Sequence, residues 1–271
     1  MLPAEIMRIP IYQVDAFAGE LFRGNPAAVC PLEHWLEDEI LQAIAAENNL
    51  SETAYYVPDN GRYRLRWFTP KVEVDMCGHA TLAAAHVILE LRREITGPKV
   101  MFDSRSGELT VAREDNLYVL DFPSLYPLEC AEELILFEAL GARPTAILRT
   151  VDYFCVFETE DQVRALTPDM NRLAAVDCRG TIATAPGKDC DFISRFFAPR
   201  AGIPEDPVTG SAHTALIPYW SRRLGKKKMF ARQVSQRGGE LWCEDRGARV
   251  GIGGRAVDYM EGHITIPAKW V

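Results

Sequence analysis

The sequence lacks the features that would assign it to a membrane or to nucleic acid. No apolar run approaches the roughly 20 residues that cross a bilayer. The first residues lack the basic-then-apolar order of a signal peptide. Acidic residues outnumber basic ones by 38 to 30, a net charge of −8, whereas phosphate binding needs a basic surface. We therefore expect neither a membrane nor a nucleic acid as partner.

Cysteine pairs and the common catalytic signatures are also absent. The seven cysteines are odd in number and scattered, with no Cys-x-x-Cys pair and no histidine at zinc spacing. This pattern is typical of reduced thiols and predicts a cytoplasmic protein. The sequence contains no P-loop, dinucleotide fingerprint, HExxH motif or Ser-His-Asp order, which excludes the chemistries that those motifs carry.

What the sequence does contain is a degenerate copy of itself. The segment "RWFTPK" at 66–71 aligns without gaps with "RFFAPR" at 195–200. Each is followed by a glycine that opens a helix of small residues, Gly78 in the first copy and Gly210 in the second, which carries a three-residue insertion. We interpret the pair as an old duplication. The alternative is two ordinary strand-turn-helix units.

Predicted strands outnumber predicted helices, many at hairpin spacing. The segment 78–94 is predominantly apolar, which predicts a helix that is buried on most faces. Its counterpart, from about Ser211 to Leu224, contains Pro218, which should remove one backbone donor and kink the helix. The expected fold class is α+β, with two pseudo-symmetric lobes, each a mostly antiparallel barrel-like sheet around a central helix.

The domain boundary is expected in 122–133, a stretch rich in proline and turn residues. This gives an N-terminal lobe over 1–125 and a C-terminal lobe over 126–271. The last strand or strands are allowed to cross back to the first lobe.

The two helix starts are candidate binding sites. The first N–H groups of a helix have no partner within it, and glycine lets a ligand approach the backbone. Two such starts facing a shared cleft would bind a carboxylate, an oxyanion or an enolate. The alternative is that Thr209 caps a helix and Gly210 eases packing.

Glu52 is the candidate base. Read as a strand, "NNLSETAYYV" places Glu52 on one face with apolar neighbours, which should raise its pKa toward a useful range. The alternative is an exposed glutamate at the start of an edge strand. His79 and Asp206 flank the two glycines and are candidates to bind substrate, or else a structural histidine and a turn former.

Four motifs together resemble the PhzF-like isomerase family of phenazine biosynthesis. They are "VDAFAGELFRGNPAAVC" at 14–30, "NLSETAYYV" at 49–57, "RWFTPKVEVDMCGHATLAAA" at 66–85 and "EDPVTGSAHTAL" at 205–216. The resemblance implies the diaminopimelate epimerase-like fold with an active site between the lobes. It also implies no metal, no organic cofactor, a small anionic substrate and a homodimer.

The resemblance also implies roles for individual residues. Glu52 would be the acid/base. The residues that would hold and polarise the substrate are Gly78, His79, Asp206, Gly210 and Ser211.

The related racemases use two thiols, one at each helix start. Here Cys77 precedes the first glycine, but Thr209 holds the second place, so we expect a one-base reaction with Cys77 and Thr209 as accessory candidates. The late segment 233–256 departs from the family pattern. The leading hypothesis is a cofactor-independent isomerase acting on a small carboxylate-bearing substrate. The alternatives are an amino-acid epimerase or hydroxyproline-type dehydratase, and a non-catalytic protein-binding module.

Overall fold

The computed structural model describes residues 6–131 and 134–267 and divides the chain into two compact units. Unit 1 comprises 1–120 together with 254–271, and unit 2 comprises 121–253. The end of the chain belongs to unit 1 because its last strand pairs along the whole first strand of the fold. No helix of the described residues is both long and apolar enough to span a membrane.

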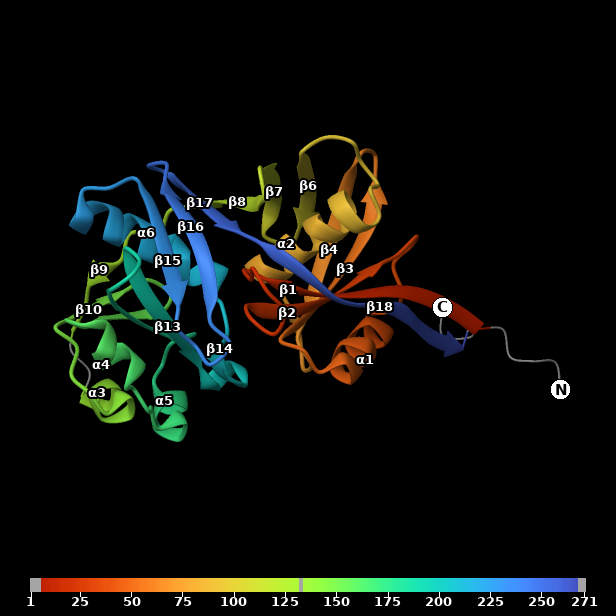
Figure 1. Cartoon of the computed structure of the whole chain (residues 1–271). Helices are drawn as coiled ribbons and strands as arrows, with labels where there is room; N and C mark the ends of the chain where they lie inside the picture. Colours follow the sequence, from red (N-terminus) through yellow and green to blue (C-terminus); the bar gives the residue numbers. More distant parts are fainter. Residues whose placement is uncertain (1–5, 132–133, 268–271) are drawn as a thin grey trace. The chain divides into compact units, whose positions relative to one another are not determined.

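Unit 1 is built from strands with two short helices. Its elements, most of which are labelled in Figure 1, are β1 (Ile6–Ala16), β2 (Asn25–Pro31), α1 (Asp38–Asn48), β3 (Glu52–Asp59), β4 (Arg62–Phe68), β5 (Glu73–Val74), α2 (Gly78–His86), the π-helix η1 (Val87–Leu91), β6 (Lys99–Ser104), β7 (Gly107–Glu114), β8 (Leu117–Pro123) and β18 (Ala256–Pro267).

Unit 2 repeats this plan with more helices. Its elements are β9 (Leu128–Glu129), α3 (Leu134–Leu140), β10 (Ala146–Arg149), β11 (Tyr153–Val156), α4 (Glu160–Arg164), α5 (Met170–Ala175), β12 (Thr181–Pro186), β13 (Phe192–Ala198), the 3₁₀-helix η2 (Pro199–Ala201), β14 (Ile203–Asp206), α6 (Gly210–Leu224), β15 (Lys228–Gln233), β16 (Gly239–Asp245) and β17 (Arg249–Gly254).

Strand pairing has the same order in both units. In unit 1, β2 is parallel to β3, β3 antiparallel to β4, and β4 parallel to β6. In unit 2, β11 is parallel to β12, β12 antiparallel to β13, and β13 parallel to β15. The crossover between the last two strands is α2 in one unit and α6 in the other, as parallel strands require. The expected fold, two pseudo-symmetric lobes around central helices, is confirmed.

The repeated Arg-aromatic-Phe motif forms the same ion pair in each unit. Arg66 binds both carboxylate oxygens of Glu73, at 2.7 and 2.8 Å. Arg195 binds both oxygens of Glu205, at 2.7 and 2.9 Å. In each copy the glutamate stands five residues before the glycine that opens the helix. This bidentate pair fixes the turn between strand and helix, which explains why the motif is retained in both halves.

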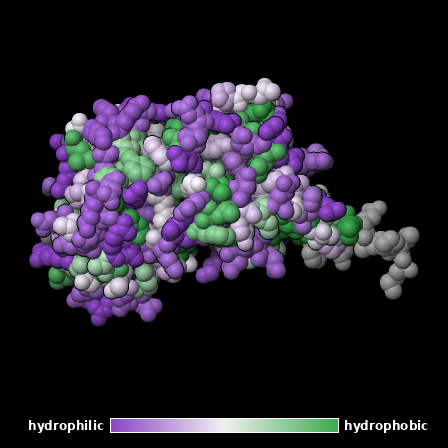
Figure 2. Space-filling view, in the orientation of Figure 1, coloured by the Kyte–Doolittle hydropathy of each residue, from purple (hydrophilic) through white to green (hydrophobic). Residues whose placement is uncertain are grey.

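The central helices form the cores of the units. All nine residues of α2 are buried, and the helix contacts β1, β2, β3, β7 and β18. In α6, Trp220 stacks on Phe192 of β13 with ring centroids 5.7 Å apart. On the face in Figure 2, hydrophilic residues predominate and hydrophobic ones form smaller patches, as expected when the apolar side chains are inside.

One helix detail differs from the sequence expectation, and the missing backbone donor of Pro218 agrees with it. The helix expected over 78–94 ends as regular α-helix at His86 and continues as a π-helix, in which the Arg92 N–H donates to the Val87 carbonyl. Pro218 lies inside a helix that continues to Leu224. Pro218 has no N–H to donate to the carbonyl of Thr214, four residues earlier in the helix. That carbonyl accepts instead from the Leu125 N–H at 3.0 Å.

Candidate functional site

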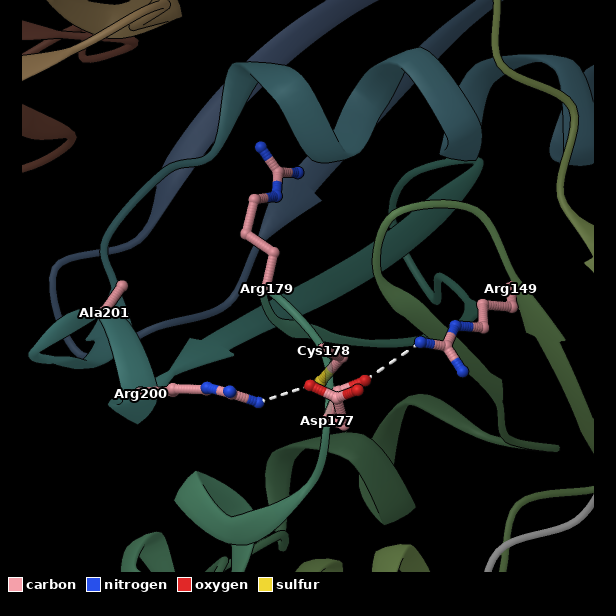
Figure 3. Close-up of a pocket in the computed structure, with 6 residues that line it drawn as sticks. All are labelled: Arg149, Asp177, Cys178, Arg179, Arg200 and Ala201. Carbon is pink, nitrogen blue, oxygen red and sulfur yellow. Dashed lines mark hydrogen bonds and ion pairs between the residues drawn. The ribbon is translucent and has the colours of Figure 1, made fainter.

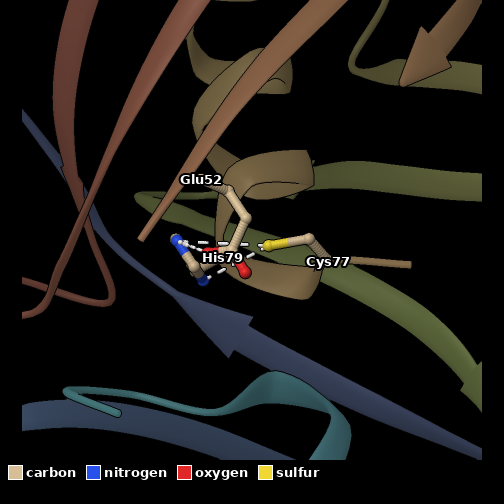
Figure 4. Close-up of side chains that lie close together, drawn as sticks. All are labelled: Glu52, Cys77 and His79. Carbon is tan, nitrogen blue, oxygen red and sulfur yellow. Dashed lines mark hydrogen bonds and ion pairs between the residues drawn. The ribbon is translucent and has the colours of Figure 1, made fainter. Parts of the chain in front are cut away.

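A buried cluster of three reactive side chains lies in unit 1, where β3 and α2 begin. Figure 4 shows Glu52, Cys77 and His79 pointing toward one another. His79 Nε2 is 3.2 Å from Glu52 Oε2, and Cys77 Sγ is 3.4 Å from His79 Nδ1. The three residues are only 9%, 7% and 4% exposed. The carboxylate therefore lies inside unit 1, and the alternative of an exposed edge-strand glutamate is wrong.

Strand pairing and a helix start bring this cluster together. The parallel strands β2 and β3 begin at the same edge, with Ala27 opposite Glu52. Asn25, the first residue of β2, reaches His79 from this edge, its Nδ2 lying 3.2 Å from Nδ1. Cys77 is the extended residue before α2, so its side chain and that of His79 lie at the open N–H groups of the first helical turn. Gly78 is the first residue of that turn.

Burial makes His79 a neutral ring. It lowers the pKa of His79 from 6.5 to about 3, because the charged imidazolium would lose its hydration. The Asn25 amide donates to Nδ1, which assigns the single ring proton to Nε2. Nε2 faces Glu52 Oε2 at 3.2 Å, and because the ring is neutral this is a polar contact and not an ion pair. One carboxylate oxygen thus lies beside a neutral imidazole.

A second polar network surrounds the start of α6 in unit 2. Thr209 Oγ1 donates to Asp206 Oδ2 at 2.5 Å, so the threonine side chain binds the aspartate and does not cap the helix. His213 Nδ1 donates to the Thr209 carbonyl at 2.8 Å. Ser211 is half-buried at the second position of the helix, after Gly210. The sequence candidates of this half are thus grouped around one turn.

Gln233 of β15 holds this turn in place. Its Nε2 donates to the Asp206 carbonyl at 2.8 Å and lies 3.2 Å from Thr209 Oγ1. Its Oε1 accepts from the Thr209 N–H at 2.8 Å. The side chain is 1% exposed, so water cannot replace these bonds.

Replacing Gln233 with Ala should destabilise the protein by about 2 kcal/mol, because buried backbone groups lose their partner. Thermal or denaturant unfolding measures this change. The exposed neighbour Gln236 provides a matched control, and Gln236→Ala should leave stability within about 0.5 kcal/mol of wild type. Equal stability of the two variants would contradict the role given to Gln233.

The two halves differ at the position of Glu52. In unit 1, Thr53 of β3 pairs with Phe68 of β4, and in unit 2, Thr181 of β12 pairs with Phe197 of β13. Because Phe68 and Phe197 occupy the same place in the repeated motif, the two threonines are equivalent. The residue before each threonine is Glu52 in unit 1 and Gly180 in unit 2. Unit 2 therefore has no carboxylate at the place where unit 1 carries its buried glutamate.

A separate pocket in unit 2 contains three arginines, each of which already has a partner. Arg200 binds Asp177 Oδ1 at 2.6 Å, and Arg149 binds the Asp177 carbonyl at 2.9 Å. Arg179 binds the buried Asp152. None of the candidate site residues lines this pocket, whose lining in Figure 3 is Arg149, Asp177, Cys178, Arg179, Arg200 and Ala201.

Sequence reasoning missed Asn25 and Gln233. Both are polar residues at the end of a strand, and both are at most 1% exposed. Gln233 shares the inward face of β15 with Met229 and Ala231, so strict alternation would have placed a glutamine in the core. Asn25 precedes the apolar run of β2, and that position was the available signal.

Solved structures of known proteins share this fold. The chain superposes on the crystal structure of a PhzF family phenazine biosynthesis protein from Enterococcus faecalis with a TM-score of 0.93 and 46% identity, over 95% of this chain and 99% of that one. A predicted epimerase from Pseudomonas aeruginosa matches with a TM-score of 0.74 and 18% identity, over 94% and 99%. The second likeness concerns the fold alone.

Sequence comparison agrees. An "Uncharacterized isomerase" from Pseudomonas aeruginosa is 54% identical over 256 residues, which cover 94% of this chain and 98% of that protein. The family model described as "Phenazine biosynthesis-like protein" matches residues 14–262. Fold and relatives together define the class, which is the isomerases of the diaminopimelate epimerase-like fold. The chain belongs to the phenazine biosynthesis-like protein family, which confirms the resemblance seen in its motifs.

Proposed function

We propose that the protein is a cofactor-independent isomerase that moves a proton on a small, carboxylate-bearing substrate, with Glu52 as the acid/base. The observation that carries the proposal is the buried Glu52 carboxylate, which lies 3.2 Å from the neutral His79 ring where α2 begins. Because the ring is neutral, it does not neutralise the carboxylate as an ion-pair partner would, and the carboxylate can take and return a proton.

The start of α2 supplies the complementary charge. Proton removal next to a carboxylate or carbonyl produces an enolate, whose negative charge needs donors in place beforehand. The first N–H groups of α2, from Gly78 onward, are directed out of the helix at its positive end. We assign Gly78 and His79 to this role and keep Asp206, Gly210 and Ser211 as substrate-binding candidates. The accessory candidates remain Cys77 and Thr209.

A one-base reaction fits these residues better than two-thiol racemisation. The position equivalent to Cys77 holds Thr209, whose hydroxyl is already committed to Asp206. A threonine hydroxyl that donates to a carboxylate is a far weaker acid/base than a thiol. An epimerase or a hydroxyproline-type dehydratase that uses Glu52 alone would share the same first step.

The direct test is hydrogen exchange. Small carboxylates, both cyclic and amino-acid-like, are first screened for binding by thermal shift, and each ligand that binds is incubated with the protein in deuterated water. We expect at least one ligand to exchange one carbon-bound hydrogen for deuterium, which mass spectrometry or proton NMR detects. Ligands that bind but exchange nothing would contradict the proposal and favour the protein-binding module.

A further inference from the structure

The cluster of Glu52, Cys77 and His79 has the composition of a metal site. One candidate ligand atom from each side chain lies within 4.8 Å of the other two. The set combines a thiol, an imidazole and a carboxylate, which are the three side-chain types that bind zinc. Magnesium and calcium, in contrast, prefer sites made of oxygen alone. We propose that these three side chains bind one thiophilic divalent cation of the zinc type.

The distances support a tetrahedral arrangement. Zn–S bonds of about 2.3 Å and Zn–N or Zn–O bonds of about 2.1 Å place sulfur about 3.6 Å from nitrogen and nitrogen about 3.4 Å from oxygen. His79 Nε2 lies 4.0 Å from Cys77 Sγ and 3.2 Å from Glu52 Oε2. Both separations are within about half an ångström of those values, so small side-chain rotations suffice.

Charge balance favours the ion in this buried place. A bare cation inside a protein is costly unless its charge is neutralised by its ligands. The Cys77 thiolate and the Glu52 carboxylate carry two negative charges, and a divalent ion cancels both. Binding releases the thiol proton to solvent. Asn25 lies 3.2 Å from His79 Nδ1. With the ion on Nε2 the ring proton moves to Nδ1, and a turn of the Asn25 amide lets its Oδ1 accept from Nδ1–H, as partners of metal-binding histidines do.

The bound ion also has a consequence for the reaction. It occupies the Glu52 carboxylate, so Glu52 can no longer take a proton, and the cation inhibits proton transfer until a chelator removes it. This consequence rests on the proposed function, whereas binding of the ion does not. The fourth position of the ion remains for water, since the chain supplies three ligands.

Cobalt is the direct probe, because Co²⁺ bound to a thiolate absorbs in the near ultraviolet. Titration of the reduced, substrate-free protein with Co²⁺ should give this band at one ion per chain, and Zn²⁺ should displace it. Cys77→Ser should abolish the band and weaken Zn²⁺ binding by about 100-fold or more. Cys190→Ser is the matched control, because this thiol bonds the Phe192 carbonyl in unit 2, and the band should be unchanged.

A measurement on the wild-type protein covers the case in which Cys77→Ser fails to fold. Zn²⁺ should protect Cys77 from alkylation, as detected by mass spectrometry of its peptide, and leave Cys190 as reactive as before. Absence of the cobalt–thiolate band, a band that persists in Cys77→Ser, or equal alkylation of Cys77 with and without Zn²⁺ would overturn the proposal. The cobalt and alkylation measurements need no substrate, so a failed exchange assay does not affect them. If they fail instead, the proposed acid/base role of Glu52 is unaffected.

Discussion

Replacing Glu52 with Gln is expected to reduce substrate-dependent hydrogen exchange by about 10³-fold, within the range that a general base contributes. Glutamine has nearly the same shape, and its amide oxygen can occupy the place of Oε2, 3.2 Å from His79 Nε2. It has no carboxylate to take a proton. Ligand affinity should therefore change by no more than about threefold, a difference of about 0.65 kcal/mol. Exchange rates and binding constants measured on the same preparation separate the two effects.

Glu47→Gln is the matched control for this experiment. Glu47 lies on α1, is exposed, and undergoes the same chemical change at the surface of unit 1. Its exchange rate should equal that of the wild type. A Glu52→Gln protein that exchanges hydrogen as fast as the Glu47→Gln protein would remove Glu52 from the reaction. Loss of binding together with exchange would make it a substrate-binding residue instead.

Much of the fold was predictable because it depends on residue patterns within single segments of the sequence. The alternation of "YRLRWF" and of "CDFISRFF" predicted the strands now seen as β4 and β13. The uniformly apolar segment after Gly78 predicted a helix enclosed by strands, and α2 is buried throughout. The repeated Arg and Phe positions predicted duplication, and the matching ion pairs of Arg66 and Arg195 give the physical reason for the repeat.

The contacts within the site depend on residues distant in the sequence. Glu52 and His79 are 27 positions apart, and Asn25 is 54 positions from His79. Only the parallel pairing of β2 with β3 brings them to one edge, and single-strand periodicity carries no information on which strands pair. The same applies to Gln233, 24 residues from Thr209. The metal-binding set was likewise invisible, because its spacing matches no zinc motif.

The difference between the halves has a steric basis at Gly180, the counterpart of Glu52. A Cβ atom at Gly180 would lie 2.3 Å from Cζ of the Phe196 ring and 2.9 Å from Cε2. The backbone cannot move away easily, because the Gly180 carbonyl accepts from the Tyr153 N–H at 3.0 Å. Phe196 is 6% exposed, so its ring has little free space to enter. Any side chain at Gly180 must therefore displace an aromatic residue of the core.

Gly180→Ala should accordingly destabilise the protein by about 3 kcal/mol, at the upper end of the cost of overpacking. Gly97→Ala is the control, since a Cβ there meets no atom within 4 Å and stability should stay within about 0.5 kcal/mol. In a double-mutant cycle, Phe196→Leu shortens the side chain and should recover at least about 1 kcal/mol of the loss. Additive effects of Gly180→Ala and Phe196→Leu in thermal unfolding would show that the ring does not exclude a side chain here. The missing second carboxylate would then need a cause other than packing, whereas coupling between the two positions makes the core of unit 2 the reason that only one half of the duplication carries a carboxylate at this place.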